Sequence, residues 1–362
     1  MVDRSAATLL LCGYYGEKNL GDDALLTVLL KDLPADCRLL ITARDVNVLH
    51  QLCPSATWVD RRSLKAVVAA VGKVDAVVLG GGSLLQDSTS FRSLIYYLAL
   101  IATARLRRRP VLLWGQGLGP LHRPISRWLV RVMLPLCSSA SWRDQTSFLL
   151  AKCWAPKLLM DVAPDPVWQL PQREWVGRGA IVLSWRPTPL LDSQGWRCLL
   201  DALAAVADRL DAPVCWLAFH QHQDAPLLSS LRERKLIPES LVHRSHTVVP
   251  TELNTVFEQV RTSRLVIPMR LHALVLARLA GCPIAALSYD PKVAAAADMA
   301  GIPWVPLAQL PDSATLAEQW YDQADQPPLK DDVERIRQDV SRHGQRLRQG
   351  LQLLRRGLGV VR

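Results

Sequence analysis

The sequence predicts an α/β protein with two Rossmann-like domains that face a central cleft. Short apolar runs alternate with amphipathic helical patterns along the chain, and this alternation is typical of parallel sheets. Many of the apolar runs end in glycine-rich or charged segments. A stretch with prolines and glycines at 169–179 separates two such series and is expected to be a linker. Because ligands bind at the carboxyl ends of parallel strands, the strand ends of both series should line the cleft.

From these patterns we expect three segments. Residues 1–168 should form an N-terminal Rossmann-like domain with glycine-rich loops, and residues 178–325 a C-terminal one. Residues 326–362 should form a basic amphipathic helix, which could pack on the body, contact a membrane surface, or do both. Its arginines are Arg335, Arg342, Arg346, Arg348, Arg355 and Arg356, and its apolar residues are Val333, Ile336, Val340, Leu347, Leu351 and Leu354.

Composition limits the class of protein. A chain of 362 residues, 49% hydrophobic and 21% charged, can bury the cores of two ordinary domains. The net charge of +10 favours phosphorylated small molecules, an anionic membrane or nucleic acid, although solvated charge without a partner explains it equally well. Eight scattered cysteines with no C-x-x-C pair indicate reduced thiols in a cytosolic protein. The N-terminal apolar run is too short for a signal peptide, and the run at 94–104 is too short to span a membrane.

Three glycine-rich segments follow predicted strands in the first half. They cover residues 13–26, 80–90 and 115–120, after strands expected at 8–12, 76–79 and 110–114. We expect each segment to be a turn at the same sheet edge, where the backbone can approach a ligand closely. One such turn is ordinary architecture, whereas three indicate a binding cleft. The candidate binding residues in these segments are Gly13, Tyr14, Asn19, Gly81, Gly82, Gln116 and Gly117.

Charged residues of the first half have two interpretations each. Asp22 and Asp23 lie in the first turn of the helix after the first glycine segment, where acidic side chains either cap the helix or face a ligand. Arg143 follows a short predicted strand and is a candidate anion ligand. The alternative for Arg143 is an exposed salt bridge with a neighbouring aspartate.

The second half contains a concentrated set of charged residues in the segment 265–293. Two buried strands and an intervening helix, expected from residue 273, place Arg270, His272 and Lys292 after the strands. A guanidinium, an imidazole and an ammonium at one sheet edge suit a small anion with several negative oxygens. A single histidine at a strand end is more often structural, but clustered like charges are costly without an anion between them. The H-Q-H sequence at 220–222 is expected to be surface or an acceptor contact, and no metal site is expected.

Seven segments, taken in order, resemble the motifs of the polysaccharide pyruvyl transferase family. They are G-Y-Y-G-x-x-N-x-G-D-D-A from residue 13, G-G-G-S-L-L-Q-D-S-T-S from 80, G-Q-G-L-G-P from 115, W-R-D-x-x-S from 142, A-P-D-P from 163, R-L-H-A from 270 and S-Y-D-P-K-V from 288. Each match alone is weak, but the ordered set is specific.

The resemblance implies a glycosyltransferase-B-like fold and an enzyme that uses phosphoenolpyruvate as its donor, with no cofactor. Such enzymes place pyruvate as a ketal on a sugar, often in a lipid-linked cell-wall precursor. The family's donor-binding positions correspond here to Arg143, Arg270, His272 and Lys292. For catalysis, His272 suits an acid that becomes a base near neutral pH. Asp22 is our first choice, and Asp23 the second, for the carboxylate that accepts the sugar proton.

Two rival functions fit parts of the sequence. A nucleotide-sugar glycosyltransferase would share the architecture, although the arginine, histidine and lysine set suits a smaller, doubly charged donor. A basic module that binds nucleic acid or a membrane would explain the charge but not the three glycine segments, so no nucleic-acid partner is expected. Arg123, Arg127 and Arg131 recur every four residues, as a solvated stripe or as a face that meets lipid headgroups or pyrophosphate. That face or the tail would help a cytoplasmic enzyme reach a lipid-linked acceptor at the inner face of the membrane.

Overall fold

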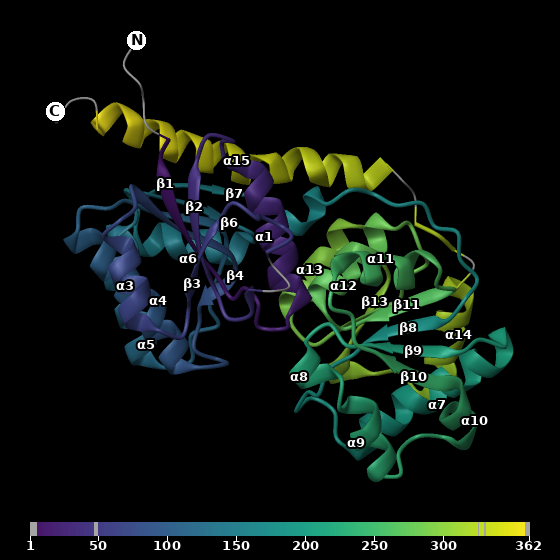
Figure 1. Cartoon of the computed structure of the whole chain (residues 1–362). Helices are drawn as coiled ribbons and strands as arrows, with labels where there is room; N and C mark the ends of the chain where they lie inside the picture. The colour runs from purple at the N-terminus through teal and green to yellow at the C-terminus, as the bar shows by residue number, and fades with distance from the viewer. Residues whose placement is uncertain (1–5, 47–49, 325, 329–330, 359–362) are drawn as a thin grey trace. The chain divides into compact units, whose positions relative to one another are not determined.

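The computed structural model describes residues 6–46, 50–324, 326–328 and 331–358 of the chain. The chain divides into two compact units (Figure 1). The first unit comprises Met1–Gln169 with Gln338–Arg362, and the second unit is Leu170–Arg337. Among the described residues, no helix has both the length and the apolar character that crossing a bilayer requires.

The first unit is built on a seven-stranded parallel sheet in the order β3-β2-β1-β4-β5-β6-β7. The order reverses between β1 and β4, which makes this pair the topological switch point of the sheet, where α/β folds bind ligands. The strands are β1 (Thr8–Cys12), β2 (Arg38–Ala43), β3 (Thr57–Asp60), β4 (Ala76–Leu85), β5 (Val111–Leu118), β6 (Ser139–Trp142) and β7 (Leu159–Val162).

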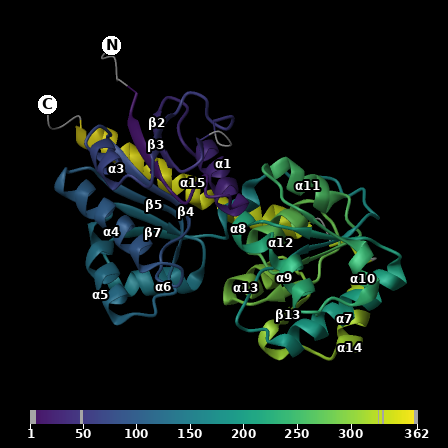
Figure 2. The same cartoon turned by 60° about the horizontal axis from the view of Figure 1, so that its bottom comes forward.

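Helices cover both faces of this sheet, so the central strands β1, β4 and β5 contain continuous apolar runs with no alternation. In both views α3, α4 and α5 form a row on one side, with α1 and α15 on the other (Figures 1 and 2). The helices are α1 (Leu20–Asp32), α3 (Leu64–Val71), α4 (Phe91–Leu106), α5 (Pro124–Met133) and α6 (Gln145–Trp154), with short 3-10 turns η1 (Leu134–Leu136) and η2 (Pro166–Gln169).

The second unit has a four-stranded parallel sheet, β10-β9-β8-β11, and a two-stranded sheet, β12-β13, joined to it through a bridge between Val266 and Ile284. The strands are β8 (Ile181–Ser184), β9 (Val214–Leu217), β10 (Ser245–Val248), β11 (Leu265–Pro268), β12 (Ala286–Ser288) and β13 (Trp304–Pro306). The helices are α7 (Ser193–Leu210), α8 (Gln221–Asp224), α9 (Leu227–Glu233), α10 (Glu239–Arg244), α11 (Leu253–Arg261), α12 (Leu271–Leu279), α13 (Pro291–Met299), η3 (Leu307–Gln309) and α14 (Ser313–Gln323).

The C-terminal segment forms the long helix α15 (Asp331–Leu358), as its periodicity predicts. The part from Gln338 onward packs with the first unit. There Arg346 pairs with Asp161 at 2.7 Å, and Arg348 donates to the Asp32 carbonyl at 3.1 Å. The predicted apolar positions Val333, Ile336, Val340, Leu347 and Leu351 are buried, whereas Leu354, Arg355 and Arg356 lie outside the described side chains.

Two of the three predicted glycine turns are wrong. Much of the second and third glycine segments continues β4 and β5, with Gly80 opposite Trp114 and Gly82 opposite Gln116. Adjacent strands can pair through glycine when the ladder tolerates an irregularity, and the register shifts between Gly82 and Leu85. The sequence pattern also predicts a helix at 45–53. Residues 47–49 of that range lie outside the described residues, and residues 50–52 form a turn.

Candidate functional site

The first glycine segment links β1 to α1 at the switch point, and it is folded around Tyr15. The buried Tyr15 hydroxyl donates to the Gly80 carbonyl at 3.0 Å, which ties this loop to β4. A Cβ on Gly13 would lie 2.3 Å from Tyr15 Cζ, so glycine is required there to admit the ring. Gly13, predicted to contact a ligand, therefore makes room for an internal side chain.

The two aspartates of this loop have different surroundings. Asp23 is buried and accepts the Gly16 N–H at 3.1 Å, which holds the turn together. Burial raises the pKa of Asp23 to about 7. Asp22 is half-buried, and its carboxylate contacts the amide of Asn19, which also caps α1 through its own carbonyl. A Cβ on Gly82 would lie 3.1 Å from Asp22 Oδ1, so this carboxylate lies beside the glycine segment of β4.

Gln116 and Gly117 serve the packing of the same sheet edge. The Gln116 side chain is fully buried and donates to the carbonyls of Leu79 and Gly81, both at 3.3 Å. It thereby holds the backbone where Gly81 and Gly82 take φ values of 58° and 80°, in the region that favours glycine. A Cβ on Gly117 would lie 3.0 Å from Arg143 Nε, so this glycine lets the arginine pass close to the backbone.

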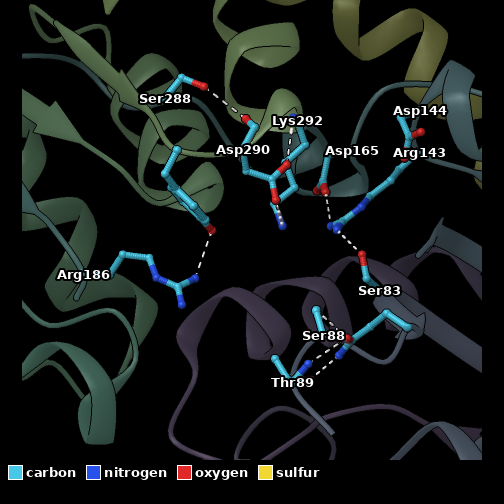
Figure 3. A network of polar contacts seen from close by, with 12 residues as sticks. Ser83, Ser88, Thr89, Arg143, Asp144, Asp165, Arg186, Ser288, Asp290 and Lys292 are labelled. Atoms are coloured by element: carbon cyan, nitrogen blue, oxygen red, sulfur yellow. Dashed lines mark hydrogen bonds and ion pairs between the residues drawn. The ribbon is translucent and has the colours of Figure 1, made fainter. Parts of the chain in front are cut away.

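Arg143 follows β6 and is fixed by two side chains. Its Nη1 lies 2.9 Å from Asp165 Oδ2, and its Nη2 donates to the Ser83 hydroxyl at 2.9 Å (Figure 3). The Arg143 side chain is only 7% exposed, so the exposed salt bridge considered as its alternative is wrong. The neighbouring Asp144 instead caps α6 through the Ser147 N–H at 2.7 Å. The guanidinium is thus held in one orientation at the carboxyl end of the sheet.

Several residues of this edge were not predicted. Asp165 and Ser83 lie inside quoted motifs, which was the signal that could have identified them. Asp165 follows β7, and Ser83 lies in the part of β4 that the sequence assigned to a turn. Glu17 is buried in the glycine loop, where it contacts Arg61 and pairs with Arg44 at 3.1 Å. These arginines follow β3 and β2, so three neighbouring strand ends contribute to one ionic cluster.

Tyr14 lies against that cluster. The Arg61 guanidinium carbon lies 4.7 Å from the centre of the half-buried Tyr14 ring, within the range of a cation–π contact. Burial, with the nearby Glu17 charge, raises the pKa of Tyr14 above its ordinary value. The phenol is therefore a neutral hydrogen-bonding group at neutral pH.

In the second unit, Arg270 is the N-cap residue of α12 and is paired with Asp224. Arg270 Nε lies 3.2 Å from Asp224 Oδ2, Nη2 contacts the other carboxylate oxygen, and Nη2 also donates to Gln223 at 3.0 Å. Asp224 is buried and accepts the His220 N–H at 2.8 Å. The segment around 220–222, expected to be surface or acceptor contact, therefore supports Arg270. The argument from uncompensated charge is wrong, because Asp224 balances Arg270.

His272 and Lys292 each occupy the second position of a helix. Helix α12 begins at Leu271, not residue 273, so His272 lies in its first turn and not on the end of β11. Lys292 lies in the first turn of α13, with Nζ 3.3 Å from Asp290, which also caps that helix (Figure 3). The two helices follow the neighbouring strands β11 and β12, so both N-termini lie at one edge of the second unit. Helix N-termini attract anions.

A further cation at this edge, Arg186, was missed. It follows β8, its Nη1 donates to the Tyr289 hydroxyl at 3.1 Å, and its guanidinium lies 4.8 Å from the centre of that ring. Arg270 pairs with Asp224 and Lys292 with Asp290, whereas the partner of Arg186 is the uncharged Tyr289, which leaves an excess of positive charge before His272 is counted. Within the described part of the chain, no group of three or more His, Cys, Asp or Glu residues could hold a metal ion.

Two parallel-sheet α/β units with polar residues at their strand ends define the class of glycosyltransferase-B-like proteins, and solved structures confirm that fold. A putative UDP-N-acetylglucosamine 2-epimerase from Listeria monocytogenes is 13% identical with a TM-score of 0.65, and covers 96% of each chain. The Methanocaldococcus jannaschii UDP-GlcNAc 2-epimerase is 11% identical with a TM-score of 0.64, over 96% of this chain and 99% of the other. Anabaena HepE, solved with UDP and glucose, is 14% identical with a TM-score of 0.56, over 98% of this chain and 100% of the other.

The sequence itself identifies the family. The model of the polysaccharide pyruvyl transferase family matches residues 19–291, and the chain belongs to that family, as its motifs predicted. The matched region includes Asp22, Arg143, Arg270 and His272, and it ends one residue before Lys292. No curated protein matches the chain significantly.

Proposed function

We propose that this enzyme of the polysaccharide pyruvyl transferase family moves the pyruvate group of phosphoenolpyruvate onto two hydroxyls of one sugar, forms a ketal and releases phosphate. The cation-rich edge of the second unit supports this most. Arg270, His272 and Lys292 lie there at two helix N-termini. Phosphoenolpyruvate carries a carboxylate and a phosphate, which match guanidinium and ammonium groups. Arg143 of the first unit is proposed to complete the donor set.

The proposed chemistry proceeds by proton transfer and two attacks. His272 gives its proton to the methylene carbon of the enol, which becomes the methyl group and leaves positive charge on the central carbon. One sugar hydroxyl attacks that carbon, and Asp22 takes the released proton. The bond between this carbon and the phosphate oxygen then breaks, with Lys292 beside the departing phosphate. The phosphate takes up one proton from solvent, and Asp22 returns its proton to solvent, so the balance closes. The second hydroxyl attacks the resulting oxocarbenium-like carbon, and its proton passes to the now neutral His272.

Asp22 remains our first choice for the carboxylate that accepts the sugar proton, because Asp22 and Asp23 differ in burial and in their contacts. Asp23 is buried and holds the Gly16 N–H of its own loop. Asp22 is half-buried beside Gly82 and contacts Asn19. A partly exposed carboxylate at the switch point is better placed to take a proton from a sugar than one enclosed in a turn.

We further propose that the acceptor is a sugar of a cell-surface polysaccharide or of its lipid-linked precursor. The enzyme would then work in the cytoplasm, peripherally at the inner face of the membrane. The alternative is a nucleotide-sugar-dependent glycosyltransferase, which the likeness to Anabaena HepE favours at the level of fold. In that case Arg270 and Lys292 would hold the diphosphate of the donor.

Phosphate release from phosphoenolpyruvate, measured with a panel of sugar acceptors, separates these functions. The panel should include lipid-pyrophosphate-linked aminosugars, and His272→Ala should be assayed beside the unaltered chain. Acceptor-dependent release that disappears in His272→Ala is the expected result. No release with any acceptor, together with transfer from a nucleotide sugar, would contradict pyruvyl transfer and support the glycosyltransferase.

A further inference from the structure

The outer face of α5 exposes a stripe of large apolar side chains. Ile125, Trp128 and Val132 are 49%, 59% and 48% exposed, and their spacing places them on one side of the helix. The opposite side, with Val130, is buried against the unit, where α5 packs on α4. Leu106, the last residue of α4, is 85% exposed. Large apolar side chains gathered on one exposed helix face are typical of a contact surface.

Within the segment that forms α4 and α5, only arginines carry full charge. Asp87, which accepts the His122 and Arg123 N–H groups at the start of α5, is buried. Between Asp87 and Asp144 the sequence contains no acidic residue and no lysine. The exposed arginines of α4 and α5 and of their ends are Arg92, Arg105, Arg107, Arg108, Arg123, Arg127 and Arg131. A stretch that combines exposed apolar residues with uninterrupted positive charge complements an anionic surface that has an apolar interior.

The arginine face predicted for α5, made of Arg123, Arg127 and Arg131, is only part of this surface, which also includes apolar side chains and the arginines of α4. Arg127 donates to the Leu121 carbonyl at 2.8 Å, and Arg123 lies 5.0 Å from the centre of the Phe91 ring. The Arg123 contact ties the N-terminal end of α5 to Phe91, the first residue of α4, and the Arg127 contact ties α5 to the loop before it. The alternative surface on α15 is less suitable, because Arg346 and Arg348 pair with the carboxylates of Asp161 and Asp32, whereas the partners of Arg123 and Arg127 carry no charge.

We infer that the α4–α5 surface, made of Leu106, Ile125, Trp128, Val132 and the exposed arginines around them, docks this enzyme on an anionic phospholipid membrane. Trp128 would lie at the headgroup level, where an amphipathic ring is favoured, with the arginines against lipid phosphates. Helix α5 follows β5, so its N-terminal end lies at the same sheet edge as Arg143. Docking would bring that edge to a lipid-linked acceptor, and this consequence rests on the proposed function.

Vesicle flotation of the full chain tests the inference without any substrate. The chain should bind vesicles that contain phosphatidylglycerol, bind pure phosphatidylcholine more weakly, and lose binding as salt is raised. Two variants remove one component each: Ile125→Ser with Trp128→Ser and Val132→Ser, and Arg105→Gln with Arg107→Gln and Arg108→Gln. Each variant should weaken vesicle binding at least about tenfold. The arginine variant loses three charges that are attracted to anionic lipid, and the apolar variant loses three side chains whose burial in the membrane favours binding.

Matched controls come from the second unit, on exposed residues away from this surface. They are Val176→Ser with Leu190→Ser and Val249→Ser, and Arg178→Gln with Arg197→Gln and Arg234→Gln. Both should bind vesicles like the unaltered chain. Equal losses in controls and test variants, or no vesicle binding at all, would overturn the inference.

Two further readouts separate the remaining outcomes. If the apolar variant changes the mass of the protein in analytical ultracentrifugation, the surface joins two copies of the chain, and membrane docking is overturned. The test variants should keep full turnover of a water-soluble acceptor, because the surface residues lie outside the proposed catalytic groups. Failure of phosphoenolpyruvate turnover would contradict the proposed function and leave the flotation result standing.

Discussion

His343 Nε2 donates to the carbonyl oxygen of Pro164 at 2.8 Å, from the C-terminal helix to the residue before Asp165. The His343 ring is fully buried and lies 6.1 Å from the Trp114 ring. Asp165 in turn holds Arg143. Helix α15, which carries no family motif, is therefore part of the chain of contacts that orients a guanidinium proposed to bind the donor.

Replacing Asp165 should impair donor binding. In Asp165→Asn, Arg143 loses its charged partner, and a charge-assisted hydrogen bond of this kind contributes about 1.5–3 kcal/mol. We expect KM for phosphoenolpyruvate to rise about tenfold or more, measured by steady-state phosphate release. Asp144→Asn is the control: the amide can still cap α6, so the variant loses only the charge at the helix N-terminus and should cost about 0.3–1 kcal/mol of stability without changing KM. Equal KM values in the two variants would show that Asp165 does not orient Arg143.

The buried imidazole of His343 should make the first unit sensitive to acid. Burial lowers the pKa of His343 to about 4 from 6.5, against the weaker opposing pull of Asp165 and Asp161. The unfolded chain therefore binds a proton between these pH values that the folded chain does not. The contribution of the neutral His343 to the free energy of unfolding is complete above pH 6.5. It is lost as pH falls toward 4, by about 1.4 kcal/mol per pKa unit.

His343→Gln, whose amide can still donate to Pro164, removes this titration. Urea unfolding at several pH values should show the stability difference between the unaltered chain and the variant change with pH in that window. A difference that stays constant from pH 7 to pH 4 would contradict the buried neutral imidazole.

Asp23 should have the opposite pH dependence. Its pKa is raised to about 7 from 3.8, so the folded chain binds a proton more readily than the unfolded chain. The protonated Asp23 therefore adds to the free energy of unfolding at low pH, and this contribution is lost as pH rises from about 4 through 7. Asp23→Asn keeps an oxygen that can accept the Gly16 N–H, so the variant should gain stability relative to the unaltered chain as pH rises. Parallel stability curves would show that Asp23 is not buried as described.

The pair formed by Arg270 and Asp224 should be important for stability as well as for the site. Asp224→Asn leaves Arg270, which is 14% exposed, without a charged partner, and breaking a buried pair costs about 3–5 kcal/mol. Asp290→Asn removes the partner of Lys292, which is 33% exposed, and should cost less than about 1 kcal/mol. Chemical denaturation of both variants checks this order, and a smaller loss in Asp224→Asn would contradict it.

Asp22 and Asp23 should differ in catalysis. If Asp22 takes the sugar proton, Asp22→Asn should lower kcat about 100-fold or more, because general base catalysis contributes about 10²–10⁴-fold. Asp23→Asn should keep most of its turnover at neutral pH. Full turnover in Asp22→Asn would assign the proton transfer to another group.

The sequence predicts the local structure well, but it predicts the pairing of distant residues poorly. The strands and most helices follow from periodicity. Of the candidate residues predicted at strand ends, Arg143 and Arg270 lie just after β6 and β11, whereas His272 and Lys292 lie in the first turns of α12 and α13. Whether a glycine run turns or continues a strand depends on the neighbouring strand, and β4 and β5 pair through theirs.

The partners of the charged side chains were missed for the same reason. Asp165 lies 22 positions from Arg143, Asp224 lies 46 from Arg270, and Pro164 lies 179 from His343. No periodicity connects such pairs, because folding alone brings them together. Their effect is large: Arg143 and Arg270, both predicted to be anion ligands, are each held by a buried carboxylate.

The most direct test of the proposed reaction is to run it in deuterium oxide and determine the product by mass spectrometry and NMR. Protonation of the enol carbon by solvent-exchanged His272 predicts a ketal whose methyl group carries one deuterium, formed together with one phosphate per acceptor consumed. A product that keeps the vinyl methylene group without deuterium, or one that has gained a sugar, would contradict pyruvate ketal formation.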